Sequence, residues 1–199
     1  MKKIMVVIFV LFLMFIGTVS AEGLGFGVKG GFNMAKFSGE DASFDDMNPK
    51  FKLGVTIGGF ATYPLGDKLT LRPEVLFTQK GGKYKESDEK ITYKMNWLDI
   101  PILAVYQVAD AIDVFVGPFI DLYLGGEVVY KYDEFEGDEK IEGEDINSLG
   151  FGLIFGGAYG VADNIEVEAR IALGLTSWHD EETVKNMGIQ VLANYYLKK

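Results

Sequence analysis

The sequence has no cysteine, a single histidine at position 179 and only 5 prolines in 199 residues. Without cysteine the chain can form neither disulfides nor Cys-ligated metal sites, so its stability must come from another kind of closure. Basic residues are also in deficit, because the formal net charge is −10. No basic stripe is left to bind phosphates, and nucleic acid is excluded as a partner.

Long hydrophobic runs are missing except at the N-terminus. There, Lys2 and Lys3 precede an apolar run, Ile4–Ile16, and the small residues of Val19–Ala21 stand before Glu22. The run is shorter than the about 20 residues of a spanning helix. This pattern predicts a secretory signal peptide over residues 1–21 and one exported domain over residues 22–199. An uncleaved N-terminal anchor is the alternative.

Helical spacing of apolar residues is also absent after residue 21, whereas alternation with a period of two recurs along the chain. Glycine is abundant, with 25 residues, and aromatic residues make up 14% of the chain, which is typical of closely packed strands and tight turns. The apolar phase changes within the fourth strand, which predicts a bulge near Asn96. The expected strands are about 24–35, 51–65, 69–80, 92–108, 114–124, 149–159, 165–175 and 187–197.

The connections between these strands alternate between long and short. The short ones are 66–68, 109–111 and 162–164, and the long ones include 81–90, 127–147 and 179–185. Outer-membrane barrels have short turns on the periplasmic rim and long loops outside the cell. The sequence therefore predicts an all-β fold, an eight-stranded antiparallel up-and-down transmembrane β-barrel.

The side chains opposite the apolar face decide which face is inside. A soluble lipocalin-like barrel would place many Lys, Glu and Thr there, facing water. This sequence instead has small residues such as Gly27, Gly58 and Gly156, with aromatic residues such as Phe60 and Phe119. Small residues suit the narrow lumen of an eight-stranded barrel, so the apolar face is expected to contact lipid.

Five charged residues of the inward phase are predicted to meet in the lumen. Arg72 and Glu74 come from the third strand, and Glu166, Glu168 and Arg170 from the seventh. Unpaired charges in a dry interior are costly, so the arginines are expected to pair with the acids and plug the pore. The alternative is that these residues line a wet tube. Nearby, Lys80 is expected to approach the outer rim, and Pro73 to bend its strand on the lipid side.

Four stretches of the sequence carry a family resemblance. They are Gly27–Asn33, Leu71–Phe77, Asn96–Ile102 and Val116–Phe119. Together they resemble the PorT-like outer-membrane β-barrel family of Bacteroidetes-type bacteria, over nearly all of residues 22–199. The resemblance implies an eight-stranded barrel in the outer membrane. Most members of that family have no known activity, and a few are linked to protein secretion.

The end of the sequence departs from such barrels, which commonly finish in an aromatic residue that the assembly machinery reads. This chain ends in Tyr195–Lys199. We expect the barrel assembly machinery to use Tyr195 and Leu197 on the lipid face instead.

Two short motifs resemble catalytic or nucleotide-binding patterns. Residues Gly25–Gly30 match GxGxxG, but no strand precedes them after residue 21 and no helix is predicted to follow. Residues Ser177–Asp180 bring a hydroxyl, His179 and a carboxylate together, yet adjacent strand residues point to opposite faces. We therefore expect no enzyme and no cofactor, and Trp178 is interpreted as a residue of the aromatic girdle at the membrane interface.

The segment Glu127–Asn147 is rich in acidic residues. Carboxylates could bind Ca²⁺ or Mg²⁺ and bridge to lipopolysaccharide phosphates, but the spacing of an EF-hand is missing. A solvated loop is the expected state, with no specific metal site.

The sequence predicts a monomer of the cell outer membrane whose function lies in surface interaction or envelope integrity. Its expected partners are outer-membrane lipid, lipopolysaccharide and the assembly machinery. Two alternatives remain open, a narrow passive channel and a soluble periplasmic lipocalin-like binder.

Overall fold

The computed structural model describes residues 23–43, 47–86, 89–132, 135–141, 146–178 and 183–199. The predicted signal peptide lies outside these ranges. Within them the secondary structure is β-strand, and no helix is long and apolar enough to cross a membrane. The strands are β1 (Gly25–Ser38), β2 (Lys52–Pro64), β3 (Leu69–Lys80), β4 (Lys83–Glu86), β5 (Glu89–Ala109), β6 (Ile112–Tyr132), β7 (Phe135–Ile141), β8 (Leu149–Ala162), β9 (Ile165–Gly174) and β10 (Lys185–Lys198).

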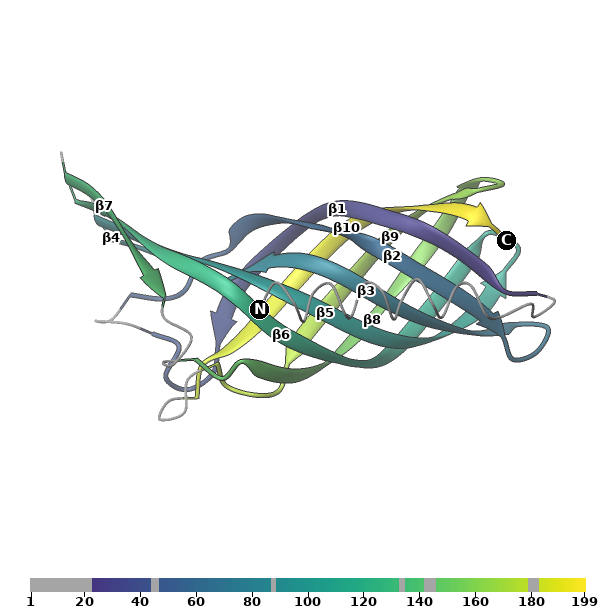
Figure 1. Ribbon diagram of the computed structural model, residues 1–199, viewed down its shortest axis with the longest axis horizontal. Coiled ribbons are helices and arrows are strands. Elements are labelled where there is room, and N and C mark those ends of the chain that lie inside the picture. Colours follow the sequence, from purple (N-terminus) through teal and green to yellow (C-terminus); the bar gives the residue numbers. More distant parts are fainter. Residues whose placement is uncertain (1–22, 44–46, 87–88, 133–134, 142–145, 179–182) are drawn as a thin grey trace.

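Eight of these strands close into a ring. The order is β1-β2-β3-β5-β6-β8-β9-β10, and β10 pairs antiparallel with β1 to complete it. Closure pairs every barrel strand on both sides, which satisfies the backbone polar groups in lipid. The predicted eight-stranded antiparallel barrel is confirmed. In Figure 1 its strands run obliquely along the long axis, and the C-terminus lies at one end.

Two connections that were predicted to be loops contain further strands. The first, 81–90, holds β4, which pairs with the outer part of β5, and the second, 127–147, holds the end of β6 and all of β7. The four strands are ordered β4-β5-β6-β7 and project beyond the barrel at the end opposite the C-terminus (Figure 1). We call this part the external sheet: β4, residues 89–96 of β5, residues 125–132 of β6, and β7.

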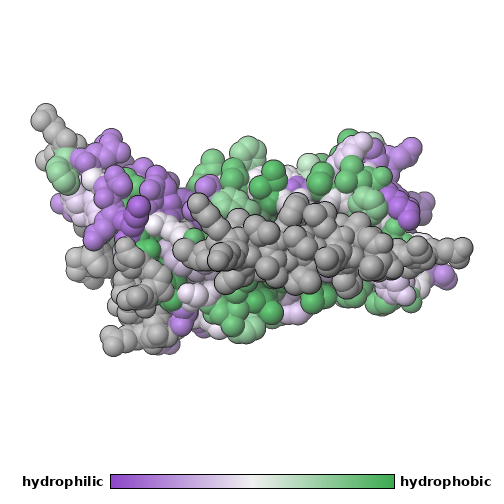
Figure 2. All heavy atoms as spheres, in the orientation of Figure 1, coloured by the Kyte–Doolittle hydropathy of each residue, from purple (hydrophilic) through white to green (hydrophobic). Residues whose placement is uncertain are grey.

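The two faces of the barrel differ as predicted. Outward side chains are apolar and exposed, as at Phe32 (61% exposed), Leu53 (65%) and Val116 (55%). The inward phase holds buried aromatic residues such as Phe60 and Phe119. Figure 2 shows hydrophobic residues around the barrel and hydrophilic residues at its two ends, as expected for a barrel in a bilayer.

Glycines on the inward phase allow close approach of neighbouring side chains. A Cβ atom at Gly27 would lie 2.5 Å from the Phe60 ring, and one at Gly156 would lie 2.7 Å from Cβ of Arg170. These positions have no room for any larger residue. The lumen is therefore filled by a few large side chains that occupy the space above glycines.

The bulge predicted near Asn96 is present, but it does not invert β5. Asn96 pairs with Gly125 and Trp97 with Tyr123, so the extra residue, Leu124, lies on β6. Along β5 the inward phase continues unbroken through Trp97, Met95 and Ile91. The inward side chains become apolar there because the strand has left the charged lumen and covers an apolar cluster outside it.

The prolines interrupt strand pairing without shifting the register. Paired residues of β2 and β3 stop at Phe60–Glu74 and resume at Tyr63–Leu71, so Pro73 lies in the gap. The gap between β3 and β5 contains Pro101 instead. The Pro73 ring lies on the same side of β3 as the partly exposed Leu71 and Val75, which is the lipid-facing side, as predicted. A missing N–H donor explains the interruption.

Candidate functional site: the filled lumen and the external sheet

Five charged side chains from three strands meet in the lumen. Glu74 forms ion pairs with all three cations: its carboxylate oxygens lie 2.6 Å from Lys29 Nζ, 3.1 Å from Arg72 Nε and 2.7 Å from Arg170 Nη1. Glu168 contacts the same cations, at 3.0, 2.8 and 3.3 Å respectively. We call these five residues, Lys29, Arg72, Glu74, Glu168 and Arg170, the inner charge cluster. Its formal charge is +1.

The inner charge cluster is shielded from water and supported by polar and aromatic neighbours. Glu74 and Glu168 are both 0% exposed. Asn194 donates to Glu168 at 3.0 Å, and the Nε–H of Arg170 donates to Gln190. The Arg72 guanidinium stacks on the Phe115 ring at 4.9 Å. Such partners are what a buried charge needs, since its desolvation costs several kcal/mol if unmatched.

Four of the five residues predicted to meet are in this cluster, and one is not. Glu166 is buried closer to the short turns, where it accepts a hydrogen bond from the Tyr196 hydroxyl at 3.0 Å. No ion pair joins it to an arginine among the described residues. The fifth member is Lys29, which is not among the residues predicted to meet.

A second charged group lies nearer the external sheet. Lys80 Nζ is 2.8 Å from Asp99 Oδ1 and 2.6 Å from Asp121 Oδ2, and the two aspartates are cross-strand partners on β5 and β6. The Lys80 ammonium also lies 4.8 Å from the Phe119 ring centroid. We call Lys80, Asp99 and Asp121 the outer charge cluster. Lys80 is the last residue of β3, near the end of the barrel that carries the external sheet, and its side chain points inward, where two carboxylates face it.

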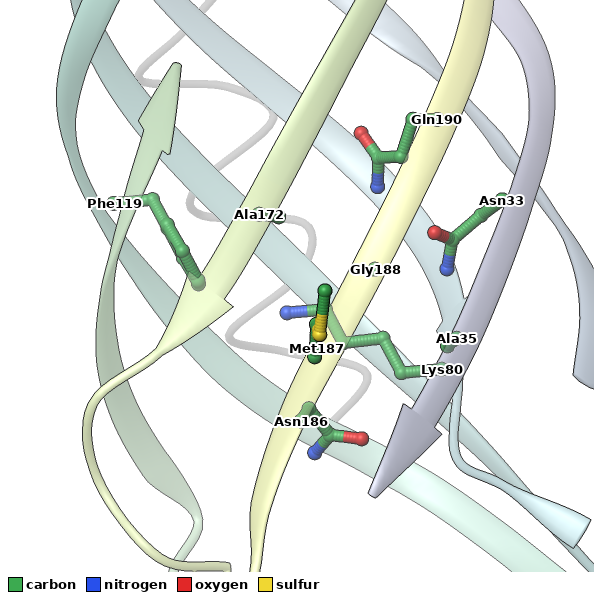
Figure 3. Close-up of a pocket in the computed structure, with 9 residues that line it drawn as sticks. All are labelled: Asn33, Ala35, Lys80, Phe119, Ala172, Asn186, Met187, Gly188 and Gln190. Carbon is green, nitrogen blue, oxygen red and sulfur yellow. The ribbon is translucent and has the colours of Figure 1, made fainter. Parts of the chain in front are cut away.

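Little empty space remains between the two clusters. A cavity of about 10 Å³ lies next to Lys80 and Phe119. Figure 3 shows the amides of Asn33 and Gln190 on its other side. A cavity of this size has room for about one water molecule. The other residues around it are Ala35, Ala172, Asn186, Met187 and Gly188.

The lumen ends differently on its two sides. Toward the short turns it opens into a cavity of about 420 Å³ whose lining includes Asp113, Glu166 and Lys199. Toward the external sheet it is covered by an apolar cluster, which we call the cap. The cap consists of Phe37, Ala42, Tyr84, Ile91, Met95, Trp97, Tyr123, Val128, Ile146 and Val184.

Trp178 packs against the cap and does not stand in a membrane girdle. Its ring stacks on Phe37 with centroids 5.5 Å apart, and it packs beside Tyr93 at 6.1 Å. The interpretation of Trp178 as an interfacial residue is therefore wrong. Its ring is partly buried there against apolar neighbours at the end of the barrel.

The catalytic and metal motifs gain no support from the geometry. Residues Gly25–Gly30 continue as part of β1, with no helix after them. Ser177 exchanges hydrogen bonds with the backbone of Val184 at 3.0 Å, while His179 and Asp180 lie outside the described residues. Within the described ranges, no three or more His, Asp or Glu side chains are placed to hold a metal ion. Residues 142–145 of the acidic segment are not among those described.

The external sheet has the side-chain pattern of a sheet in water. Its inward residues Ile91, Met95 and Val128 join the cap, while Lys94 and Glu127 form an exposed ion pair at 2.7 Å. The outward face is thus polar where the barrel's is apolar. Partial burial and the nearby Glu139 carboxylate raise the pKa of the Tyr130 phenol, so this hydroxyl stays neutral.

Known structures share this architecture. Neisserial surface protein A aligns with 16% identity and a TM-score of 0.56, covering 87% of this chain and 99% of that chain. Ail, the attachment invasion locus protein of Yersinia pestis, aligns with 14% identity and a TM-score of 0.53, covering 89% and 100%. At these identities the likeness is one of fold. None of the curated protein sequences matches this chain significantly.

The family model for the outer membrane protein beta-barrel domain matches residues 19–180, well over half of the sequence. The match agrees with the closed eight-stranded ring and its apolar outer face. It places the protein in the cell outer membrane, so the soluble lipocalin-like alternative is wrong. The chain belongs to the outer membrane protein beta-barrel domain family.

Proposed function

We propose that this protein is a closed outer-membrane barrel that presents its external sheet for interactions at the cell surface. The observation that carries the proposal is the division of the molecule into two parts. The barrel's interior is occupied by two charge clusters and a cap, whereas the external sheet stands free of the ring. A filled interior suits an anchor, and an exposed sheet suits recognition.

The contents of the lumen support a closed state. The inner charge cluster ties β1, β3 and β9 together across the interior, and the outer charge cluster ties β3 to β5 and β6. An ion would have to displace buried, mutually paired charges to pass. The cap adds a water-excluding layer above them.

The tip of the external sheet has features of an interaction surface. Phe135 is 67% exposed there, while Tyr130 and Tyr132 are partly buried and stack with their ring centroids 6.3 Å apart. Exposed aromatic side chains are enriched where proteins bind partners. The strand β7 beside them is an edge strand with acidic side chains, Glu136, Asp138 and Glu139, which keep it from unspecific pairing.

The names of the structural neighbours agree with a surface role. One is called a surface protein and the other an attachment invasion locus protein. A further structure shows Ail in complex with the heparin analogue sucrose octasulfate, with 13% identity, a TM-score of 0.52 and coverage of 88% and 100%. A sulfated glycan is accordingly one probe for this protein.

Conductance separates the closed anchor from the alternative of a narrow passive channel. The purified protein is inserted into planar bilayers and the current is recorded. We expect no steady open level, because the charge clusters and the cap fill the lumen. A steady current of reproducible amplitude would favour the channel.

A second experiment separates surface interaction from envelope integrity. Residues 131–136 are replaced by a two-residue turn, which keeps the Tyr130–Gly137 pair and the cap. A deletion strain is complemented with either form, and attachment to heparin-coated and plain surfaces is compared with sensitivity to detergent. We expect the shortened form to restore detergent resistance fully and to lose attachment. Equal attachment by both forms would contradict a role for the tip of the external sheet.

We also propose that the chain is monomeric and of the PorT-like type. The ring closes within one chain, which supports a monomer. The stretches that carry the resemblance supply lumen residues, namely Lys29, Arg72, Glu74, Trp97, Asp99 and Phe119. Native mass spectrometry tests the first point. A solved structure of a PorT-like protein tests the second, which requires the same contacts between its lysine, arginine and glutamate.

A further inference from the structure

The outward face changes its chemistry across three successive rows of cross-strand neighbours where the barrel meets the external sheet. The first row, Phe77–Leu98–Leu122, is apolar. The second, Gln79–Asn96–Gly125, is polar, and Gln79 Nε2 donates to Asn96 Oδ1 at 3.5 Å. The third, Lys94–Glu127–Lys140, is charged. The sequence of rows matches the passage from hydrocarbon to headgroups in a bilayer leaflet.

A groove of about 450 Å³ lies at the second and third rows. Its lining consists of Gln79, Lys94, Asn96, Gly125, Gly126, Glu127, Lys140 and Ile141. We call it the boundary groove. The absence of a side chain at Gly125, where a Cβ would meet nothing within 4 Å, leaves the surface hollow. The volume is in the range of ligand sites.

The charges of the boundary groove favour an anion. Lys94 pairs with Glu127 at 2.7 Å, and Lys140 stands beside Glu127 on β7, so the row carries a formal charge of +1. This local excess of positive charge occurs in a protein whose formal net charge is −10. The amides of Gln79 and Asn96 add hydrogen-bond donors one row closer to the membrane.

We infer that the boundary groove binds the phosphorylated headgroup of a glycolipid in the outer leaflet. The phosphate would lie against Lys94 and Lys140, and the sugar hydroxyls against Gln79 and Asn96. The acyl chains would then run down over Phe77, Leu98 and Leu122. Clustered lysines at the headgroup level are a general means of binding anionic lipids. A soluble anion would gain the charge contacts but not the contact between acyl chains and the apolar row.

This inference concerns the membrane-facing surface and does not rest on the closed lumen or on the surface-interaction proposal. A steady current or unchanged attachment would contradict the proposed function and leave the lipid inference intact. A failure to retain lipid A would contradict the lipid inference and leave the proposed function intact. The experiments therefore report on each separately.

The test measures how much lipid the purified, folded protein retains in detergent by native mass spectrometry. The probes are bisphosphorylated lipid A, the same lipid with both phosphates removed, and inorganic phosphate. We expect wild type to retain lipid A at least tenfold better than the dephosphorylated lipid. Inorganic phosphate at the same concentration is expected neither to bind nor to compete.

Two double variants with the same loss of charge locate the site. K94Q/K140Q removes both lysines of the boundary groove, while K85Q/K90Q removes a cross-strand pair elsewhere on the external sheet. We expect at least a tenfold loss of lipid A retention in the first and none in the second. The single variant K140Q changes only an edge strand, so it tests the groove with little risk of misfolding. The folding of every variant is checked by its mobility on unheated gels.

Three results would overturn the inference. Equal loss in both double variants would mean that net charge alone matters. Retention independent of the phosphates would mean that only the acyl chains are recognised. Competition by inorganic phosphate would mean that the groove is a site for a free anion.

Discussion

Lys29 Nζ lies 2.6 Å from Glu74 Oε1, and this contact joins strands β1 and β3 across the barrel interior. The two residues are not adjacent in the ring, because β2 stands between their strands. Arg72 of β3 also reaches Glu168 of β9, on the opposite side of the ring, at 2.8 Å, so the lumen is narrow enough for side chains to bridge it. The charges that meet there also determine which substitution in the inner charge cluster lowers the free energy of unfolding most.

The first prediction compares the two sides of that contact. E74Q leaves three buried cations facing the single carboxylate of Glu168, whereas K29M leaves two cations facing two carboxylates. Breaking a buried pair by removing one partner typically costs about 3–5 kcal/mol. We expect E74Q to lower the free energy of unfolding by an amount in that range and K29M by clearly less. Urea unfolding in lipid vesicles, followed by tryptophan fluorescence, measures both. A larger effect of K29M would contradict the charge balance described above.

The second prediction concerns the outer charge cluster. K80M leaves Asp99 and Asp121 facing each other with no cation between them, and the free energy of unfolding should fall. Removing one of the two charges as well, in K80M/D121N, should recover part of the loss. The same unfolding measurement gives the coupling energy of a double-mutant cycle. No recovery in the double variant would mean that Lys80 contributes by packing on Phe119 and Trp97 alone.

The third prediction uses two neighbouring glycines as a matched pair. A Cβ at Gly31 would lie 2.2 Å from the Val191 carbonyl oxygen, whereas one at Gly30 would have 3.6 Å to the Thr56 carbonyl oxygen. We expect G31A to cost about 1–3 kcal/mol through overpacking. G30A should be close to neutral. Folding yield and urea midpoint are the measurements, and similar values for both variants would argue against the close approach of β1 and β10.

The fourth prediction tests which end of the molecule is outside the cell. The protein has no cysteine, so a single cysteine reports its own position. T92C places a thiol on the external sheet, and A111C places one in the short turn between β5 and β6. A membrane-impermeant maleimide should label T92C in intact cells, and A111C only after the outer membrane is permeabilised. The reverse pattern would invert the topology.

The fifth prediction concerns insertion into the membrane. Tyr195 and Leu197 lie on the lipid face of β10 and are 45% and 59% exposed. If the assembly machinery reads them, Y195A/L197A should reduce the amount of folded protein in the outer membrane severalfold. V167A, at an equally exposed position on β9, serves as the control. Unchanged insertion of Y195A/L197A would show that another signal is used.

The sequence was a good guide to the barrel and a poor guide to what lies beyond it. Strand alternation located all eight ring strands, because each residue's face depends only on its neighbours in the chain. The change of apolar phase at Ile91 and Met95 predicts an irregular strand. In the structure it is the regular pattern of a strand whose inward side chains have become apolar. Periodicity reports that two faces differ, but not which solvent each face meets.

For the lumen, the sequence indicated which side chains point inward but not which of them touch. Arg72, Glu74, Glu168 and Arg170 were expected together and lie together, while Glu166 binds Tyr196. The sequence around Lys29 indicates no partner for it, because it is the one charged residue in the glycine-rich stretch 25–33. Asp99 and Asp121 were not paired with Lys80, because their meeting depends on the register between β5 and β6.

The sequence by itself determined the number of ring strands and their antiparallel order, which follow from the local period of two and from loop lengths, and the face that meets lipid, which follows from the small residues of the opposite face. Only the tertiary structure decided the charge pairs, the cap and the boundary groove. Ring closure with a particular stagger brings Lys29 to Glu74 and Glu168, which are 45 and 139 positions away in the chain. That stagger is a property of the closed barrel as a whole, so no single strand encodes it.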